Sequence, residues 1–83
     1  MNVDKKLAIA FRQLGLHIKN LREERDISIK ELSKKTGIRE EYLTKIENGT
    51  AYGVMLERHL AKIAKVFEIK FSQLFEFDNY YEK

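Results

Sequence analysis

The chain has 83 residues, contains neither cysteine nor proline, and carries a formal net charge of +3. This length corresponds to one small domain that buries roughly 60–65% of its unfolded surface. Without cysteine the chain has no disulfide framework and no thiolate metal site. No apolar run approaches the ~20 residues that span a bilayer, and charges interrupt the N-terminal region where a secretory signal would be apolar. We therefore expect a single soluble, cytoplasmic domain over residues 1–83.

The charge is unevenly distributed along the chain. Residues 76–83 contain three acids and one base, a net charge of −2, so residues 1–75 carry +5. Three of the last seven residues are aromatic as well, which makes 76–83 an acidic aromatic tail. A basic body is consistent with a polyanionic partner such as nucleic acid.

A long amphipathic helix is predicted at the N-terminus. Apolar residues recur from Leu7 to Leu21 at spacings of three and four, after a plausible N-cap at Asp4, and this period is typical of a helix with one buried face. We expect the helix to end near Arg25-Asp26. Gly15 interrupts the pattern and is expected to weaken the helix by about 1 kcal/mol relative to alanine.

Two short helices joined by a tight turn follow, over residues 28–48. Ser28 and Glu31 have the spacing of a capping box, which predicts a helix over about 29–35. Gly37 is expected to end it in the left-handed conformation, and the small Ser33 allows two helices to cross closely. A second helix over about 39–48 is predicted to end at Asn48-Gly49.

The remaining residues predict two more helices. Leu56, Leu60, Ile63 and Phe67 share one helical face, residues 68–70 turn the chain, and Ser72 is expected to cap a short fifth helix. The fold class is therefore all-α, a compact five-helix bundle. The predicted core consists of Phe11, Ile18, Leu21, Ile27, Leu32, Leu43, Ile46, Leu60, Ile63, Phe67 and Leu74.

These residues resemble a known family. The resemblance is carried by Ile27-Ser28, Glu31-Leu32-Ser33, Thr36-Gly37-Ile38 and residues 42–49, with Leu21-Arg22 before them and residues 63–65 and 71–75 after them. This pattern is similar to the XRE family, the phage-repressor and Cro-type helix-turn-helix DNA-binding domains. The resemblance spans about residues 14–75 and implies a lambda repressor-like fold.

The resemblance implies a sequence-specific transcriptional regulator that binds double-stranded DNA as a homodimer. In helix-turn-helix proteins the second helix of the motif enters the major groove. The implied base-contacting residues are Arg39, Glu40, Glu41, Thr44 and Lys45. The implied phosphate-contacting residues are Ser28, Lys30, Lys34 and Asn48. Arg22 and Glu47 match a pair that is salt-bridged in many members, and an arginine fork suits a carboxylate.

Each of these assignments has a structural alternative. Glu40 and Glu41 also stabilise a helix N-terminus by their charge, Lys30 and Lys34 also suit an ordinary solvated face, and Tyr42 can fill the space beneath the second helix. Residues 4–13 precede the usual start of the family's first helix. They either lengthen that helix over the core, or form a dimer contact or a DNA-binding arm.

Three features depart from the family's pattern. Ile29 replaces a glutamine that contacts phosphate in many relatives, Glu40 and Glu41 add negative charge to the recognition helix, and residues 50–53 are uncharged. The alternative function is therefore a protein-interaction module, an antitoxin or adaptor, that keeps the fold with weak or no specific DNA binding. Its aromatic patch would comprise Phe67, Phe71, Phe75, Phe77, Tyr80 and Tyr81. The homodimer interface is predicted at these C-terminal aromatics first and at the N-terminal extension second.

An enzyme is not expected. His17 and His59 are the only histidines and belong to different predicted helices. We find no nucleophile pair, no glycine-rich phosphate loop and no metal-ligand spacing. No catalytic residue, metal, cofactor, membrane association or small-molecule ligand is predicted.

Overall fold

The computed structural model describes residues 5–51 and 56–77, and over these residues the secondary structure is entirely helical. Its elements are α1 (Lys5–Glu24), α2 (Ile29–Thr36), α3 (Glu40–Glu47), α4 (Leu56–Phe67) and η1 (Phe71–Phe75). The all-α prediction is confirmed. The fifth helix is not: η1 is a short 3-10 helix.

The start of η1 differs from the prediction. Ser72, the expected cap, lies inside η1, and Lys70 occupies the N-cap position. The side chain of Gln73 accepts a hydrogen bond from the Lys70 backbone N–H at 2.7 Å. Because the first turn is held by an amide three residues on, no serine hydroxyl is needed there.

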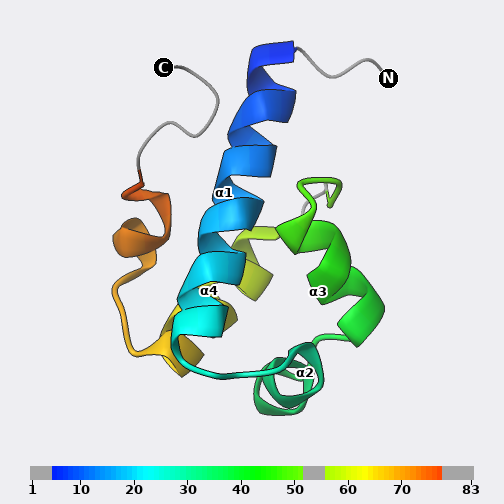
Figure 1. Ribbon diagram of the computed structural model, residues 1–83, viewed down its shortest axis with the longest axis vertical. Coiled ribbons are helices and arrows are strands. Elements are labelled where there is room, and N and C mark those ends of the chain that lie inside the picture. Colours follow the sequence, from blue (N-terminus) through cyan, green and yellow to red (C-terminus); the bar gives the residue numbers. More distant parts are fainter. Residues whose placement is uncertain (1–4, 52–55, 78–83) are drawn as a thin grey trace.

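Helix α1 is the axis around which the other elements are arranged (Figure 1). It packs against α3 on one side and η1 on the other, while α2 lies between α3 and α4. The N-terminal turns of α1 extend past α3 in Figure 1. Residues 5–13 are continuous with the rest of α1, as a longer first helix requires, and Leu7 and Ile9 in this part remain exposed. The predicted cap Asp4 lies outside the described residues.

The core lies between the four helices and η1. Its buried apolar residues are Leu14, Ile18, Leu32, Ile38, Leu43, Ile46, Ala51, Leu56, Leu60, Ile63, Ala64, Phe67 and Leu74. Phe11, Leu21 and Ile27, which were predicted to be core, are only partly buried at its edge. Ile38 and Ala51 were not predicted, because they lie in connecting segments that carry no helical period.

Three helices end in the same way. After α3, the N–H of Thr50 donates to Lys45 O at 2.9 Å and the N–H of Gly49 donates to Ile46 O at 3.1 Å, with Gly49 at φ +75°. This is a Schellman motif. The same pair of bonds closes α1 and α4, where Asp26 (φ +52°) and Glu68 (φ +59°) take the left-handed position. Because neither residue is glycine, the sequence did not predict the left-handed conformation at these two helix ends.

Gly15 has a different role from the one its helix propensity predicted. Its place in α1 is buried, and a β-carbon there would lie 2.4 Å from the carbonyl oxygen of Ile46 and 2.5 Å from that of Glu47. Real β-carbons do not approach oxygen so closely. Glycine therefore allows α1 and the end of α3 to cross with their backbones in contact.

Candidate nucleic-acid interface

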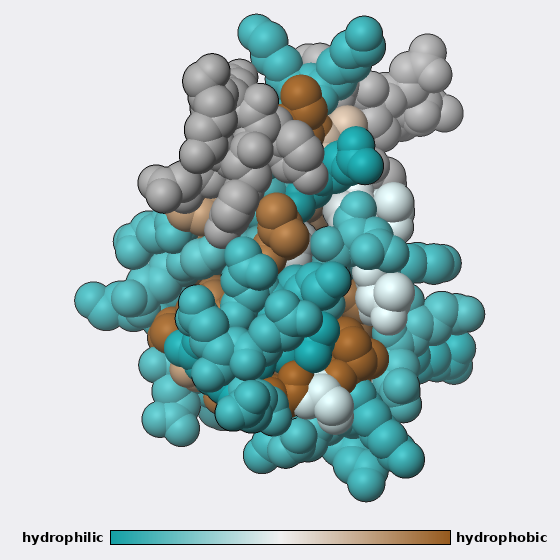
Figure 2. Space-filling model, in the orientation of Figure 1, coloured by the Kyte–Doolittle hydropathy of each residue, from teal (hydrophilic) through white to brown (hydrophobic). Residues whose placement is uncertain are grey.

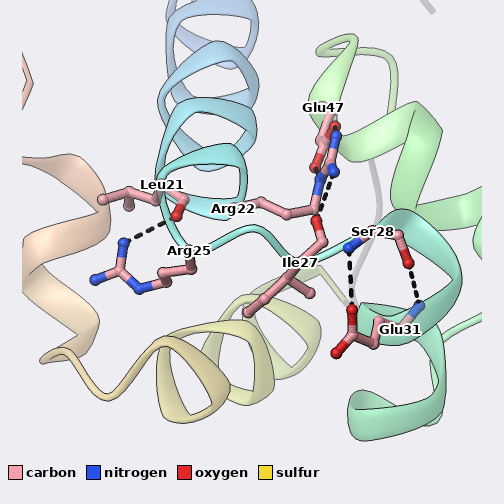
Figure 3. Close-up of polar contacts among 7 residues, drawn as sticks. All are labelled: Leu21, Arg22, Arg25, Ile27, Ser28, Glu31 and Glu47. Atoms are coloured by element: carbon pink, nitrogen blue, oxygen red, sulfur yellow. Dashed lines mark hydrogen bonds and ion pairs between the residues drawn. The ribbon is translucent and has the colours of Figure 1, made fainter.

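The start of α2 is fixed by its predicted capping box. The hydroxyl of Ser28 accepts from the Glu31 backbone N–H at 3.0 Å, and Glu31 Oε1 accepts from the Ser28 N–H at 3.4 Å (Figure 3). Both residues are exposed. The cap thus holds the end of α2 that is predicted to face the DNA backbone.

The turn between α2 and α3 is held by side chains as well as by glycine. Gly37 adopts φ +78° and its N–H donates to Ser33 O at 2.8 Å, which confirms the predicted end of α2. The Thr36 hydroxyl accepts from the Ile38 N–H at 3.2 Å, and the Ser33 hydroxyl donates to the Ile38 carbonyl. Ser33 therefore contributes a hydrogen bond in addition to its small size. These contacts set the direction in which the chain enters α3.

Helix α3 has one buried face and one solvent-facing face. Leu43 and Ile46 are 1% and 3% exposed and fix the rotation of the helix on the core. The side chains predicted to meet base edges are all exposed: Arg39, Glu40, Glu41, Thr44 and Lys45. Arg39 is the N-cap residue and makes no capping hydrogen bond with its side chain. The guanidinium of Arg39 thus does not cap the N-terminus of α3.

The predicted phosphate-contacting residues are also exposed. Ser28 and Lys30 stand at the start of α2, Lys34 near its end, and Asn48 at the C-cap of α3. The backbone N–H of Asn48 donates to Thr44 O at 3.0 Å.

Arg22 and Glu47, the pair implied by the family resemblance, form a two-pronged ion pair between α1 and α3 (Figure 3). Arg22 Nε lies 2.8 Å from Glu47 Oε2, and a second guanidinium nitrogen lies 3.2 Å from Oε1. Its third nitrogen donates to Ile27 O at 2.8 Å. The side chains are only 12% and 7% exposed, and the hydrogen bond to Glu47 raises the pKa of Arg22 although burial opposes it. This pair ties the end of α3 to α1 and to the entry of α2.

A second contact with α1 holds the segment after α3. Gly49 is buried, and a β-carbon on it would lie 2.6 Å from the Cα of Arg12. The sequence predicted Gly49 only as a helix end. Its packing against α1 depends on tertiary geometry, for which the dipeptide Asn48-Gly49 gives no signal.

Tyr42 lies behind the exposed face of α3. Its ring meets the His59 ring edge-on at 5.0 Å between centroids, and it is half-buried. This geometry agrees with the space-filling alternative for Tyr42. Burial, with the nearby charges of Lys62 and Arg58, lowers the pKa of His59. His17 is half-buried and packs against Phe77 at 5.2 Å between ring centroids.

Over the described ranges, no helix is both long and apolar enough to cross a membrane. In the same ranges, no three His, Cys, Asp or Glu side chains are grouped as metal ligands. The face in Figure 2 is mainly hydrophilic, with separate apolar patches.

The comparison with known protein families identifies the domain. A profile of the Cro/C1-type helix-turn-helix DNA-binding domain matches residues 17–79. The chain belongs to this family. The matched range contains the α2–turn–α3 unit together with the Arg22–Glu47 pair, and it begins after the first three turns of α1. Those turns lie outside the matched range.

A solved structure supports the same assignment. An HTH_3 family transcriptional regulator from Vibrio cholerae is 32% identical and superposes with a TM-score of 0.71 over 82% of this chain. The chain spans 38% of the length of that protein. Among curated proteins, none matches the chain.

Proposed function

We propose that this Cro/C1-type domain is a transcriptional regulator that binds specific double-stranded DNA, with α3 in the major groove. The observation that carries the proposal is that α3 has one buried face and one exposed polar face. Leu43 and Ile46 pack it on the core, while five side chains able to meet base edges, including that of the N-cap residue, face solvent. The major groove offers a distinct donor and acceptor pattern for each base pair, so an exposed polar helix face of this kind is suited to reading sequence.

The individual contacts follow from side-chain chemistry. Lys45 and Arg39 suit the guanine acceptors O6 and N7, Glu40 and Glu41 suit the cytosine amino group, and Thr44 suits a thymine methyl. Ser28, Lys30, Lys34 and Asn48 are proposed to contact phosphates. Arg22 and Glu47 are proposed to act structurally, by holding the end of α3 that these contacts depend on.

We also propose that the regulator acts as a homodimer. Two recognition helices in successive major grooves must lie about one DNA turn, ~34 Å, apart. Phe71 and Phe75 support an interface at η1, because they are 40% and 45% exposed and their rings are 5.4 Å apart. Phe67 is buried, which confirms its place in the predicted core and removes it from the aromatic patch; Tyr80 and Tyr81 lie outside the described residues. Leu7 and Ile9 are the second candidate surface.

The test is selection of binding sites from a pool of random duplexes, followed by affinity against salt for the selected site. The proposal predicts a consensus with two-fold symmetry and a log–log salt slope of several units. If no sequence is enriched and only weak salt-sensitive binding remains, specific DNA recognition is wrong. The interaction module would then be favoured, because Glu40 and Glu41 place negative charge on α3.

A further inference from the structure

A groove between α2 and α4 is basic and is not used by the proposed DNA contacts. It has a volume of about 460 Å³ and is lined by Lys35, Thr36, Lys62, Lys65 and Val66. Among the residues that the structure describes, no acid lines it. Val66 is half-buried and Thr36 is buried, so the groove combines a small apolar floor with three ammonium groups at its edge.

The lysines of the groove form no ion pair with another described residue. In residues 5–51 and 56–77, ion pairs within 4.0 Å join Arg22 to Glu47 and Arg25 to Glu24, and none involves these three lysines. Lys35 and Lys65 lie in the last turns of α2 and α4, where the helix dipole alone favours a cation. Lys62 lies in the middle of α4, where that explanation does not apply. Three unpaired cations around one concavity are complementary to a polyanionic ligand.

The position of the groove argues against DNA as that ligand. Its lining comes from α2 and α4, and α3 contributes no residue. Ser33, which bonds to Ile38 at the entry to α3, stands on the other flank of α2 from Lys35, because residues two apart are rotated by about 200° around a helix. A ligand in the groove therefore leaves the exposed face of α3 free.

We propose that this groove binds an acidic peptide segment of a partner protein. Carboxylates of the segment pair with Lys35, Lys62 and Lys65, and an apolar side chain beside them packs on Val66. Because the groove and α3 are separate, the partner can be held while DNA is bound. The proposal does not depend on DNA recognition and can be tested apart from it.

The test uses a fluorescein-labelled peptide of glutamates flanking a leucine, with a glutamine-for-glutamate peptide as its uncharged counterpart. Fluorescence anisotropy at low salt measures binding to the full chain. The triple variant Lys35→Gln, Lys62→Gln, Lys65→Gln should weaken binding about tenfold, since each exposed pair contributes roughly 0.2–1 kcal/mol. A matched triple variant, Lys5→Gln, Lys19→Gln, Lys70→Gln, removes the same charge elsewhere and should change binding less than twofold. Equal loss in both triples would overturn the proposal.

Two further measurements complete the test, and the first of them uses the unaltered chain, so it does not depend on the stability of the variants. Amide shifts of the unaltered chain on peptide addition should be largest at Lys35, Thr36 and Val66, and shifts scattered over lysine-bearing surfaces would overturn the proposal. Duplex affinity should fall no further in the groove triple than in the control triple. If the groove triple alone loses duplex affinity, the groove is part of the DNA footprint and the acidic-peptide assignment is wrong.

Discussion

Gly15 of α1 and Ile46 of α3 meet backbone to backbone, so that a β-carbon on Gly15 would stand 2.4 Å from the Ile46 carbonyl oxygen. Ile46 is also one of the two buried residues of α3. The close crossing therefore places α1 directly behind the helix that is proposed to read DNA.

The substitution Gly15→Ala tests this crossing, because the crossing decides whether the free energy of unfolding rises or falls. In an open helix the substitution stabilises by about 1 kcal/mol. Here the added carbon must push α1 and α3 apart, and overpacking costs about 1–3 kcal/mol. We therefore expect a lower free energy of unfolding by urea denaturation. Ala10→Gly, at an exposed site of the same helix, measures the effect of helix propensity alone on the free energy of unfolding. A stabilised Gly15→Ala variant would contradict the crossing.

Arg22→Ala should remove the tie between α1, α3 and the entry to α2. It leaves Glu47, whose side chain is 7% exposed, without a partner, and we expect a loss of about 2–4 kcal/mol in unfolding free energy. Arg22→Lys should retain only part of the lost unfolding free energy, because an ammonium group cannot form the forked contact with the carboxylate.

The control for Arg22 is Glu24→Gln. Glu24 approaches Arg25 only to 4.0 Å and its side chain is 71% exposed, so its loss should stay within about 0.5 kcal/mol. A double-mutant cycle on Arg22 and Glu47 with no coupling energy would show that the pair does not stabilise the fold.

Glu68→Gly should stabilise the domain. Glu68 closes α4 at φ +59°, a conformation that costs an L-residue roughly 1–2 kcal/mol and glycine very little. Allowing for the greater unfolded-state entropy of glycine, we expect a gain of about 0.5–1 kcal/mol in thermal or urea unfolding. Ala61→Gly, at an exposed site in the middle of α4, should instead destabilise by about 1 kcal/mol. Destabilisation by both changes would argue against the left-handed closure.

Stability should fall as the pH drops below the ordinary histidine value of about 6.5. The pKa of His59 is lowered by burial and by Lys62 and Arg58, and Arg39 and Tyr42 line the same cavity from the α3 side. Between that lowered pKa and about 6.5 the unfolded chain binds more protons than the folded one, so the free energy of unfolding rises with pH.

The measurement for this prediction is the melting temperature from about pH 8 to about pH 5. His59→Gln should flatten the profile in that window, whereas His17→Gln should retain the contribution of His59. An unchanged slope in His59→Gln would mean that another group causes the acid sensitivity.

Lys45→Ala and Lys34→Ala should separate base reading from phosphate contact. Loss of Lys45 should relax preference at one base pair by about 1–3 kcal/mol. Loss of Lys34 should weaken binding to all sequences and reduce the salt slope by about one unit. Affinities for the selected duplex and its single-base variants distinguish the two. If Lys34→Ala instead changed the preference at one base pair and Lys45→Ala weakened binding to all sequences, the assigned roles of the two lysines would be wrong.

The local signals in the sequence predicted the helix-turn-helix well. The capping box at Ser28 and the left-handed Gly37 depend on residues within one turn of each other, and both are confirmed. Periodicity likewise found the buried faces of α3 and α4. These features are short-range, so a single sequence contains the information that defines them.

The misses depend on contacts distant in sequence or on unfavoured conformations. Gly15 lies against Ile46, thirty-one positions away, and periodicity describes each helix alone. Glu68 takes a left-handed conformation against its own preference. Ser72 fits the composition of a cap, but Gln73 satisfies the first turn of η1 instead. The groove of Lys35, Lys62 and Lys65 joins two helices, so it becomes visible only once they are packed.

The most direct test of the central claim is an NMR titration of the labelled chain with the selected duplex and with an unrelated duplex. We predict that the selected duplex shifts the amides and side chains of α3 from Arg39 to Lys45, together with those at the start of α2. The unrelated duplex should perturb mainly the residues proposed to contact phosphates, such as Lys34. If both duplexes gave the same small shifts, or if the shifts lay on α4 and η1, α3 would not be a recognition helix.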